Sequence, residues 1–265
     1  MSKSYEIIKN FFARENIDSF SAIKSDNLSV INERIMPENV KSCVMFFIPY
    51  YTGKHENRNV SLYSVSLDYH LYIKELSARF EGDNEHYFKF FADTSPINER
   101  AAAIDAGLGF VGQNGLLISE KYGSYVFIGT LLTDAEFDED EYTTAKEKKS
   151  CIGCGLCKKN CAFLRGERDF CLSELTQRKN VTDEELEVIK NHPLVWGCDT
   201  CQEVCPNNRD VSETPIEFFR KDLLERIDAE MIENMSKDEF SKRAYAWRGK
   251  KTILRNLQVD NSRNT

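Results

Sequence analysis

The spacing of apolar residues predicts alternating helices and strands over the first part of the chain. Residues 4–14 place apolar side chains at helical spacing, which predicts a helix at the start. The continuous apolar run at 42–49 ends in proline and is typical of a buried strand. Residues 68–80 carry apolar positions four residues apart and predict a second helix.

Two more strands and a third helix follow. The alternating run at 86–91 predicts a strand, and so does the apolar run at 124–133. Between them, Ser95-Pro96 predicts the start of a helix with proline at its first position, and Gly107 predicts its end. The pattern therefore indicates an α+β fold in which helices cover a sheet.

The last part of the chain consists of an acidic stretch, a cysteine-rich segment and helical patterns. Residues 134–141 contain six carboxylates and little that could enter a core, so they indicate a solvated boundary. Residues 215–227 carry an apolar stripe at helical spacing, and 236–247 predict another helix. We therefore expect three consecutive modules, residues 1–145, 146–210 and 211–265.

The composition is that of a folded chain rather than a disordered one. Of the 265 residues, 41% are hydrophobic and 29% are charged. No apolar run approaches the roughly 18 residues that span a bilayer, and the N-terminus lacks the pattern of an export signal. We therefore expect a cytoplasmic monomer with no membrane partner.

The net charge of −8 disfavours a protein coated with nucleic acid on every side, but it is compatible with a local basic groove. One stretch, residues 242–255, is basic and contains no acid. It forms either a phosphate-binding patch or a solvated helix face. Its six basic residues are Lys242, Arg243, Arg248, Lys250, Lys251 and Arg255.

The cysteines are clustered in one segment, because eight of the nine fall between residues 151 and 205. Without an export signal the compartment is reducing, so clustered cysteines indicate metal or redox chemistry rather than disulfides. Eight thiolates are the number that two four-iron clusters require, and in the bacterial ferredoxin pattern the fourth cysteine of a run binds the other cluster. This pattern predicts that Cys151, Cys154, Cys157 and Cys205 hold one [4Fe-4S] cluster and that Cys161, Cys171, Cys198 and Cys201 hold the second.

Structural zinc is the alternative, because it also takes four thiolates per ion. Three cysteines separated by successive two-residue gaps fit a cubane better than paired zinc knuckles do, so the spacing favours iron–sulfur. Ala162 follows Cys161 where the ferredoxin pattern has proline. Cys43 lies in the first apolar run and is expected to be a small buried hydrophobe.

Four glycines between residues 107 and 115 suggest a phosphate-binding loop, but their context does not support one. They follow a predicted helix rather than a strand, and they miss the spacing of a dinucleotide-binding motif. We expect them to let the backbone pass close to a large planar cofactor.

Seven segments match one known family in kind and order. They are LDYH (67–70), FADTSPINERAAAIDAGLGFVGQNGLLIS (91–119), GSYVFIGTLLTD (123–134), CIGCGLCKKNC (151–161), CLSELTQ (171–177), WGCDTCQEVCPNN (196–208) and RGKKTILRN (248–256). In this combination the chain resembles the epoxyqueuosine reductase family over nearly its whole length. Many members continue into a helical-repeat segment that helps to hold tRNA, so the chain resembles a short form.

The resemblance implies a cobalamin-dependent iron–sulfur enzyme that reduces epoxyqueuosine in tRNA to queuosine. It implies an N-terminal module that binds cobalamin and is similar to the flavin nitroreductase fold. A ferredoxin-like module with two [4Fe-4S] clusters and C-terminal helices would follow. An external donor of the ferredoxin or flavodoxin type would supply the electrons.

The resemblance also carries over to individual positions. The family's proton-donating aspartate falls on Asp93, and its Glu-Arg pair falls on Glu99 and Arg100. Gln113 stands where the family's Gly-Lys-Asn motif has lysine. The residues implied to contact cobalamin are Asp68, Tyr69, His70, Asp93, Arg100, Gln113 and Asn114.

An acid at Asp93 needs a raised pKa to hold a proton near neutral pH, and an apolar pocket would raise that pKa by desolvation. The candidates for the pocket wall are Phe91, Phe110 and Phe127. Glu99 is the rival acid, and pairing with Arg100 would keep it ionised. From the local sequence alone, Asp93 is typical of a cap or turn, and His70 could simply lie in a first helical turn.

Two other functions stay open. The same scaffold could reduce a small substrate, which the acidic charge and Gln113 favour. A two-cluster electron-transfer protein with no chemistry of its own is the other alternative, and it would not bind cobalamin.

Overall fold

The computed structural model describes residues 2–143 and 150–261 of the chain. It forms two compact units, each built from discontinuous segments. The first unit comprises Met1–Pro49, Tyr69–Gly153 and Val211–Ile216, and the second comprises Tyr50–Asp68, Cys154–Asp210 and Glu217–Thr265. The three consecutive modules stay a prediction, and their first boundary, at residues 145 and 146, lies outside the described residues.

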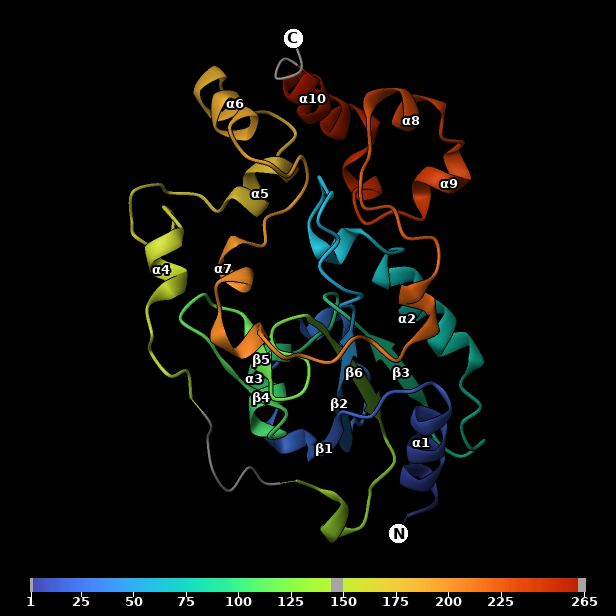
Figure 1. The fold of residues 1–265 in the computed structure, drawn as a ribbon. Helices are drawn as coiled ribbons and strands as arrows, with labels where there is room; N and C mark the ends of the chain where they lie inside the picture. The colour runs from blue at the N-terminus through green and yellow to red at the C-terminus, as the bar shows by residue number, and fades with distance from the viewer. Residues whose placement is uncertain (1, 144–149, 262–265) are drawn as a thin grey trace. The chain divides into compact units, whose positions relative to one another are not determined.

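A four-stranded antiparallel sheet forms the centre of the first unit (Figure 1). In spatial order its strands are β1 (Phe20–Lys24), β2 (Ser42–Pro49), β6 (Val126–Thr133) and β3 (Phe88–Phe91). A separate hairpin pairs β4 (Gly109–Val111) with β5 (Leu117–Ser119). The helices of this unit are α1 (Lys3–Arg14), α2 (Tyr69–Arg79) and α3 (Glu99–Asp105). These elements confirm the mixed α+β prediction.

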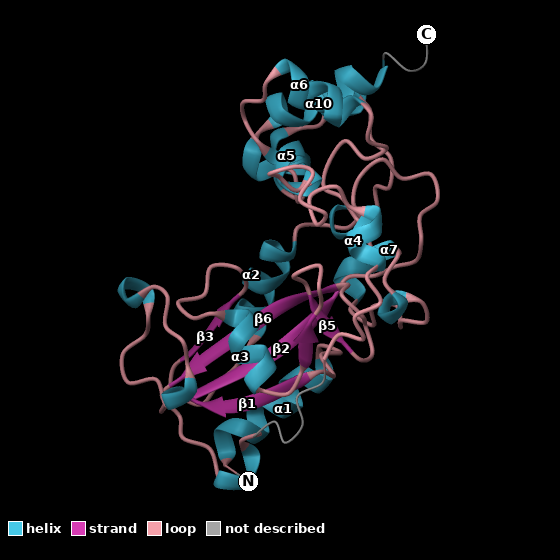
Figure 2. Ribbon diagram, turned by 90° about the vertical axis from the view of Figure 1, so that its left-hand side faces the viewer, coloured by secondary structure: helices cyan, strands magenta, loops and turns pink. Residues whose placement is uncertain are grey.

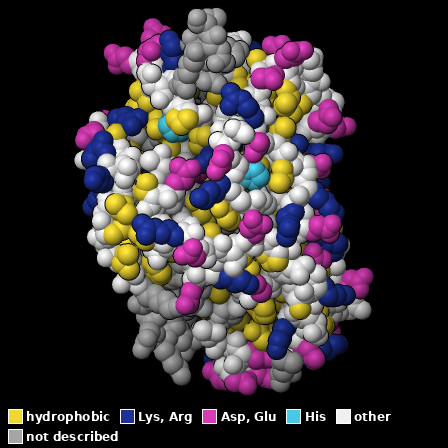
Figure 3. All heavy atoms as spheres, in the orientation of Figure 1, with side chains coloured by type: hydrophobic (Ala, Val, Ile, Leu, Met, Phe, Trp, Pro, Cys, Tyr) yellow, Lys and Arg dark blue, Asp and Glu magenta, His cyan; other side chains and the backbone are white. Residues whose placement is uncertain are grey.

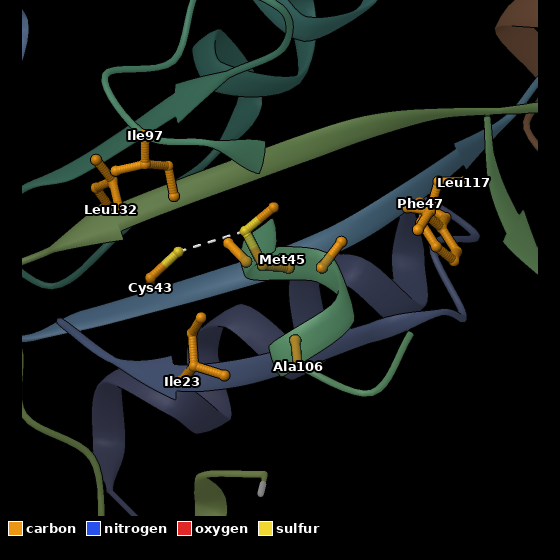
Figure 4. Close-up of a cluster of buried hydrophobic side chains, with 10 residues drawn as sticks. Ile23, Cys43, Met45, Phe47, Ile97, Ala106, Leu117 and Leu132 are labelled. Atoms are coloured by element: carbon orange, nitrogen blue, oxygen red, sulfur yellow. Dashed lines mark hydrogen bonds between the residues drawn. The ribbon is translucent and has the colours of Figure 1, made fainter. Parts of the chain in front are cut away.

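Both faces of the sheet are covered, which explains why all eight residues of β2 are buried. Cys43 and Met45 lie on the face that packs against the alanines of α3, and Figure 4 shows them beside Ala106. Phe46 lies on the opposite face, where its ring centroid is 4.8 Å from that of Phe12 in α1. Cys43 is 0% exposed and burial raises its pKa, so its prediction as a buried hydrophobe is confirmed.

Gly129 on β6 lies directly opposite Phe46, and the contact leaves no room for a side chain. A methyl group on Gly129 would lie 2.3 Å from the Phe46 ring, which Phe12 and Phe90 hold in place. We expect Gly129→Ala to lower the free energy of unfolding by about 1–3 kcal/mol through overpacking, as measured by chemical denaturation. An unchanged free energy would contradict this view of a rigid aromatic core.

The second unit contains only helices and loops, whereas all the strands in the described ranges lie in the first unit (Figure 2). Its core includes Trp196 and Tyr245, whose rings meet edge to face at 6.1 Å. Within residues 2–143 and 150–261, no helix is both long and apolar enough to cross a membrane. The helices of this unit are α4 (Leu156–Asn160), α5 (Leu172–Gln177), α6 (Asp183–Lys190), α7 (Thr200–Glu203), α8 (Ala229–Asn234), α9 (Lys237–Ser241) and α10 (Lys250–Asn261).

The predicted helix start at Ser95-Pro96 is wrong, because α3 begins three residues later. The side chain of Asn98 caps this helix by accepting a hydrogen bond from the Ala101 N–H. The Pro96 carbonyl is already used, since it accepts hydrogen bonds from the amides of Ile31 and Asn32. The predicted end at Gly107 is confirmed, with φ at +71°.

The helix predicted over 215–227 is also wrong. Only a short 3-10 turn forms there, at Glu217–Arg220. The end of the segment pairs with distant residues instead. The Asn59 side chain donates to the Ile227 carbonyl and accepts from the Ile227 N–H, and Leu224 donates to the Val65 carbonyl. Over 236–247, only α9 is α-helical.

The acidic stretch at 134–141 is less solvated than its composition predicts. Ala135 and Phe137 are buried. Glu141 is 9% exposed, and it accepts hydrogen bonds from both the backbone N–H and the hydroxyl of Ser2. This segment therefore packs onto the first unit rather than forming a free boundary.

Candidate functional site

Asp93 lies in a tight turn that follows β3 directly. The Thr94 N–H donates to the Ala92 carbonyl at 2.7 Å, which makes Asp93 the central residue of a γ-turn. Its φ is +59°, in the left-handed region that costs a residue with a side chain roughly 1–2 kcal/mol. Strain of this kind is often found at functional sites, where the surrounding structure must hold it.

The side chain of Asp93 is exposed and is oriented by a tyrosine. The Tyr69 hydroxyl donates a hydrogen bond to Asp93 Oδ2. The Tyr69 ring is 8% exposed and stacks on Phe127 with a centroid distance of 4.0 Å, and His70 lies 4.1 Å from it. The structure thus brings together three of the residues implied by the family, and it places Phe127, one of the candidates for the pocket wall, against the tyrosine ring.

Glu99 lies beneath the same turn and is half-buried. One of its oxygens accepts from the Asp93 N–H at 3.1 Å, and the other accepts from the Thr130 hydroxyl at 3.2 Å. Burial, and after it the charge of Asp93, raises the pKa of Glu99 to about 7. Arg100 donates instead to the Gly115 carbonyl at 3.0 Å, so the expectation that it keeps Glu99 ionised is wrong.

The loop between β4 and β5 gathers a second set of predicted residues. Arg100 reaches this loop from α3 through its bond to Gly115, and Gln113 is exposed in the loop. Asn114 Oδ1 accepts from the Leu116 N–H at 3.2 Å. Its Nδ2 is buried and has no hydrogen-bond partner among the described residues. A buried amide donor without a hydrogen-bond partner is suited to donate to a bound polar group.

Asp68 differs from the other predicted cofactor residues, because it belongs to the second unit. Its N–H donates to the Lys242 carbonyl at 2.9 Å. Among the residues that sequence reasoning missed is Thr130, which anchors Glu99. No local signal marks it, since it is one threonine in an apolar strand.

Four cysteines of the second unit act on one another electrostatically. Burial raises the pKa of Cys201 to about 12, and repulsion from three other thiolates contributes. These thiolates belong to Cys161, Cys171 and Cys198. They are the set that the sequence assigns to the second cluster, and they come from separate segments of the chain.

A buried ion pair fixes the loop that carries two of these cysteines. Asp199, 1% exposed, lies between Cys198 and Cys201, and Arg58 Nη1 is 2.9 Å from its Oδ2. The same oxygen accepts from the Leu62 N–H at 2.8 Å. Gly197 precedes the loop with φ at +74°, and a side chain there would clash with Ser61.

Three of the four cysteines predicted to hold the other cluster lie in or beside α4 and α7, and these two helices pack together. Cys157 is buried in α4, Cys154 is exposed, and the Asn207 amide donates to Cys205 Sγ at 3.6 Å. Cys151 belongs to the first unit, near the end of its segment Tyr69–Gly153. In the described part of the chain, no three His, Cys, Asp or Glu side chains form a group that could hold a single metal ion.

Comparison with known proteins places this fold in a class. No family model matches the chain. The solved structure of epoxyqueuosine reductase from Streptococcus thermophilus superimposes with a TM-score of 0.75 at 24% identity, covering 98% of this chain and 81% of that one. An epoxyqueuosine reductase solved with a tRNA-Tyr epoxyqueuosine-modified stem loop superimposes with a TM-score of 0.72 at 22% identity, covering 97% and 81%. The fold is therefore the one that these reductases share.

Sequence similarity is what shows the family. The epoxyqueuosine reductase of Listeria monocytogenes is 34% identical in an alignment 277 positions long, gaps included, and the alignment covers 92% of this chain and 70% of the relative. The chain belongs to the epoxyqueuosine reductase family and is an oxidoreductase.

Proposed function

We propose that the protein is a cobalamin- and iron–sulfur-dependent reductase that converts epoxyqueuosine in tRNA to queuosine. The observation that carries the proposal is Asp93, an exposed carboxyl held in a strained turn and oriented by the Tyr69 hydroxyl. The family and its tRNA-bound structural relative support the substrate.

The chain's own residues fit a polar, planar cofactor in the first unit. The unpaired Nδ2 of Asn114 is a donor that needs an acceptor, and Arg100 of α3 reaches the same loop through its hydrogen bond to the Gly115 carbonyl. Bound cobalamin would supply the two electrons of the reduction. We propose that this module is nitroreductase-like and that the residues holding cobalamin are Asp68, Tyr69, His70, Asp93, Arg100, Gln113 and Asn114.

The cysteine-rich segment would deliver those electrons from two [4Fe-4S] clusters in a ferredoxin-like module. Mutually repelling thiolates fit such a group, because bound metal cations stabilise the deprotonated sulfur. We propose that Cys161, Cys171, Cys198 and Cys201 hold one cluster and that Cys151, Cys154, Cys157 and Cys205 hold the other. An external ferredoxin or flavodoxin would reduce them, and we propose that the protein works as a cytoplasmic monomer.

Asp93 would act as the acid. Removing an epoxide oxygen to leave an alkene consumes two electrons and two protons, and the oxygen leaves as water. Hydroxide is a poor leaving group, so a carboxyl placed at that oxygen would promote its departure. Tyr69 would orient Asp93 toward the substrate through its hydroxyl.

A basic stretch in the second unit is the proposed contact with the tRNA backbone. Three of its side chains serve the fold, because Arg243, Lys250 and Arg255 donate to backbone carbonyls. Lys242 and Lys251 are exposed. Arg248 stacks on Trp247, which is 59% exposed, at 3.7 Å from the ring centroid. The half-buried Arg248, stacked on the exposed Trp247, offers both a charge and a stacking surface for an unpaired base.

Reversing two of these charges is expected to weaken tRNA binding. In Arg248→Glu/Lys251→Glu the salt dependence of binding should flatten by about two units, since each lost phosphate contact lowers the slope by roughly one. Fluorescence anisotropy with a tRNA stem loop at several salt concentrations measures this slope.

The matched control is Lys9→Glu/Lys74→Glu, which makes the same change in net charge on exposed positions of α1 and α2. On the face drawn in Figure 3, basic and acidic side chains are interspersed. If only the net charge of the protein mattered for tRNA binding, the test variant and the control variant should therefore weaken it equally. Equal slopes for both double variants would contradict a specific contact. If the unaltered protein binds no tRNA, the small-substrate reductase becomes the better proposal.

Anaerobic reconstitution of the clusters, followed by cobalamin titration and turnover of an epoxyqueuosine-containing stem loop, tests the function as a whole. Cobalamin binding and formation of queuosine are expected. Clusters without cobalamin binding would favour the electron-transfer alternative.

A further inference from the structure

Two lysines at the end of α4 form an exposed positive surface in the second unit. Lys158 and Lys159 lie in the last turn of this helix, and both are exposed. Neither lysine forms an ion pair with another residue in the described ranges. Their charges are therefore open to solvent and to any partner that approaches this helix.

The chain that follows α4 folds back onto the helix and adds an exposed aromatic residue. The Arg165 N–H donates to the Cys161 carbonyl at 3.1 Å, and the Arg165 guanidinium donates to the Lys159 carbonyl at 2.5 Å. Phe163 lies within the turn that these bonds close and is 41% exposed. We refer to Lys158, Lys159 and Phe163 together as the α4 surface. Protein interfaces combine aromatic side chains with a polar rim in the same way.

The α4 surface adjoins cysteines that are predicted to hold both clusters. Cys157 lies in α4 itself, and Cys161 follows the helix directly. Cys154 precedes the helix and is exposed, whereas the other cysteines are buried or half-buried. In addition, α4 packs against α7, which carries Cys201 (Figure 1). A partner bound at this surface would therefore lie close to predicted ligands of the clusters.

We propose that the α4 surface is the docking site of an acidic electron-carrier protein that reduces the clusters. The inference rests on the proposed function, because it names the surface at which the external electron donor acts. The net charge of −8 repels an acidic partner from the protein as a whole. Two lysines without ion-pair partners would direct its approach to one place, and Phe163 would supply an apolar contact there.

Each encounter would move one electron. The carrier is oxidised by one electron, and a bound [4Fe-4S] cluster is reduced by one. No bond forms or breaks, so the surface only has to hold the two redox groups near each other for a short time. Small interfaces are typical of such encounters. Two encounters supply the two electrons that the reduction of one epoxide consumes.

The competing occupant of a basic surface is the phosphate backbone of tRNA. The position of the α4 surface favours the electron carrier instead. Electron transfer requires proximity to the clusters, whereas a phosphate contact gains nothing from neighbouring cysteines. Binding of tRNA at this surface is therefore the alternative outcome of the test.

Anaerobic binding and reduction of the cluster-loaded protein test the proposal without any substrate. The probes are an acidic bacterial ferredoxin and an acidic bacterial flavodoxin, each labelled for fluorescence anisotropy. The carrier that binds the unaltered protein more tightly is then reduced, and stopped-flow absorbance follows its reaction with the clusters. The test variant is Lys158→Glu/Lys159→Glu. The matched control is Lys221→Glu/Lys237→Glu, which makes the same change in net charge at exposed positions elsewhere in the second unit.

At low salt we expect the test variant to lower the affinity and the second-order rate constant roughly tenfold or more, because charge steering contributes about 10–10³-fold to association. The difference should shrink in about 1 M salt, where charges are screened over roughly 3 Å. The control should stay near the unaltered protein, and all three proteins should contain the same amount of iron. Equal losses in the two double variants would overturn the proposal, and so would the failure of both carriers to bind the unaltered protein.

Phe163→Ala tests the apolar part of the surface. We expect roughly tenfold weaker binding of the carrier at every salt concentration, because truncating an aromatic side chain at the centre of an interface speeds dissociation. Leu223→Ala is the control, since Leu223 is another exposed apolar residue of the second unit, and it should bind the carrier normally. Equal affinities for Phe163→Ala and the unaltered protein would contradict the proposed surface.

Binding of a tRNA stem loop separates the two occupants. Lys158→Glu/Lys159→Glu should bind tRNA as the unaltered protein does. Weaker tRNA binding together with unchanged carrier binding would assign the surface to tRNA and overturn the proposal.

Turnover with a chemical reductant separates this inference from the proposed function. If the chemically reduced protein forms no queuosine, the proposed function fails, and carrier binding still decides the docking site. If queuosine forms but neither carrier binds, the docking site fails and the proposed function stands.

Discussion

The Asp93→Asn variant is expected to lose most of its epoxide reduction, with kcat lowered roughly 10²–10⁴-fold, the usual contribution of a positioned general acid. Asparagine cannot supply a proton, but it is nearly the same size and tolerates a left-handed φ better than most residues do. The turn and its bond to Glu99 should therefore survive the change. Single-turnover kinetics with an epoxyqueuosine stem loop measure the loss.

Control measurements must show that Asp93→Asn still binds its cofactors and is as stable as the unaltered protein. Iron content, cobalamin binding and the free energy of unfolding should match those of the unaltered protein. Tyr69→Phe provides a second comparison, because it keeps the ring stacked on Phe127 and removes only the hydroxyl that bonds Asp93. Its loss should be smaller than that of Asp93→Asn. Full turnover by a correctly loaded Asp93→Asn enzyme would leave Asp93 with a structural role only.

The cysteine assignments predict the second large effect, which is on metal content. Cys201→Ser and Cys154→Ser should each remove about four irons per chain, because they belong to different predicted [4Fe-4S] clusters. In the described structure, Cys201 is the half-buried thiol that three other thiolates repel, so its loss should disrupt the whole group. Iron and acid-labile sulfide analysis after anaerobic reconstitution measures the change.

Cys43→Ala is the matched control, since Cys43 is buried in β2 within the apolar cluster of the sheet. It should retain all the iron. A protein that takes up two zinc ions and no iron would contradict the cluster assignment for both sets of cysteines.

Local sequence patterns predicted elements whose environment is uniform along their length. The apolar run at 42–49 forms β2 with the same bounds, because a strand covered on both faces needs apolar side chains at every position. The stripe at 4–14 forms α1, since a helix on one face of a sheet buries one side. The assignment of the cysteines to two clusters, which rests on their spacing, stays a prediction.

Other features depended on contacts between residues far apart in the chain, which no local pattern carries. The apolar residues at 215–227 have helical spacing. The backbone N–H and carbonyl of Ile227 nevertheless bond to the side chain of Asn59, which is 168 residues away in the chain. Glu99 and Arg100 are neighbours in sequence, yet Arg100 turns to Gly115 and leaves Glu99 against Thr130.

The sequence by itself determined the family, the main strands and helices, and the residue types available for chemistry. Only the tertiary structure decided the raised pKa of Glu99 and the conformation of the Asp93 turn. Burial by the sheet raises the pKa of Glu99, and the Asp93 turn adopts a positive φ because Tyr69 and Glu99 hold it. The desolvation of Glu99 and the strain at Asp93 arise from what surrounds each residue in space, and these surroundings come from α2, α3 and β6.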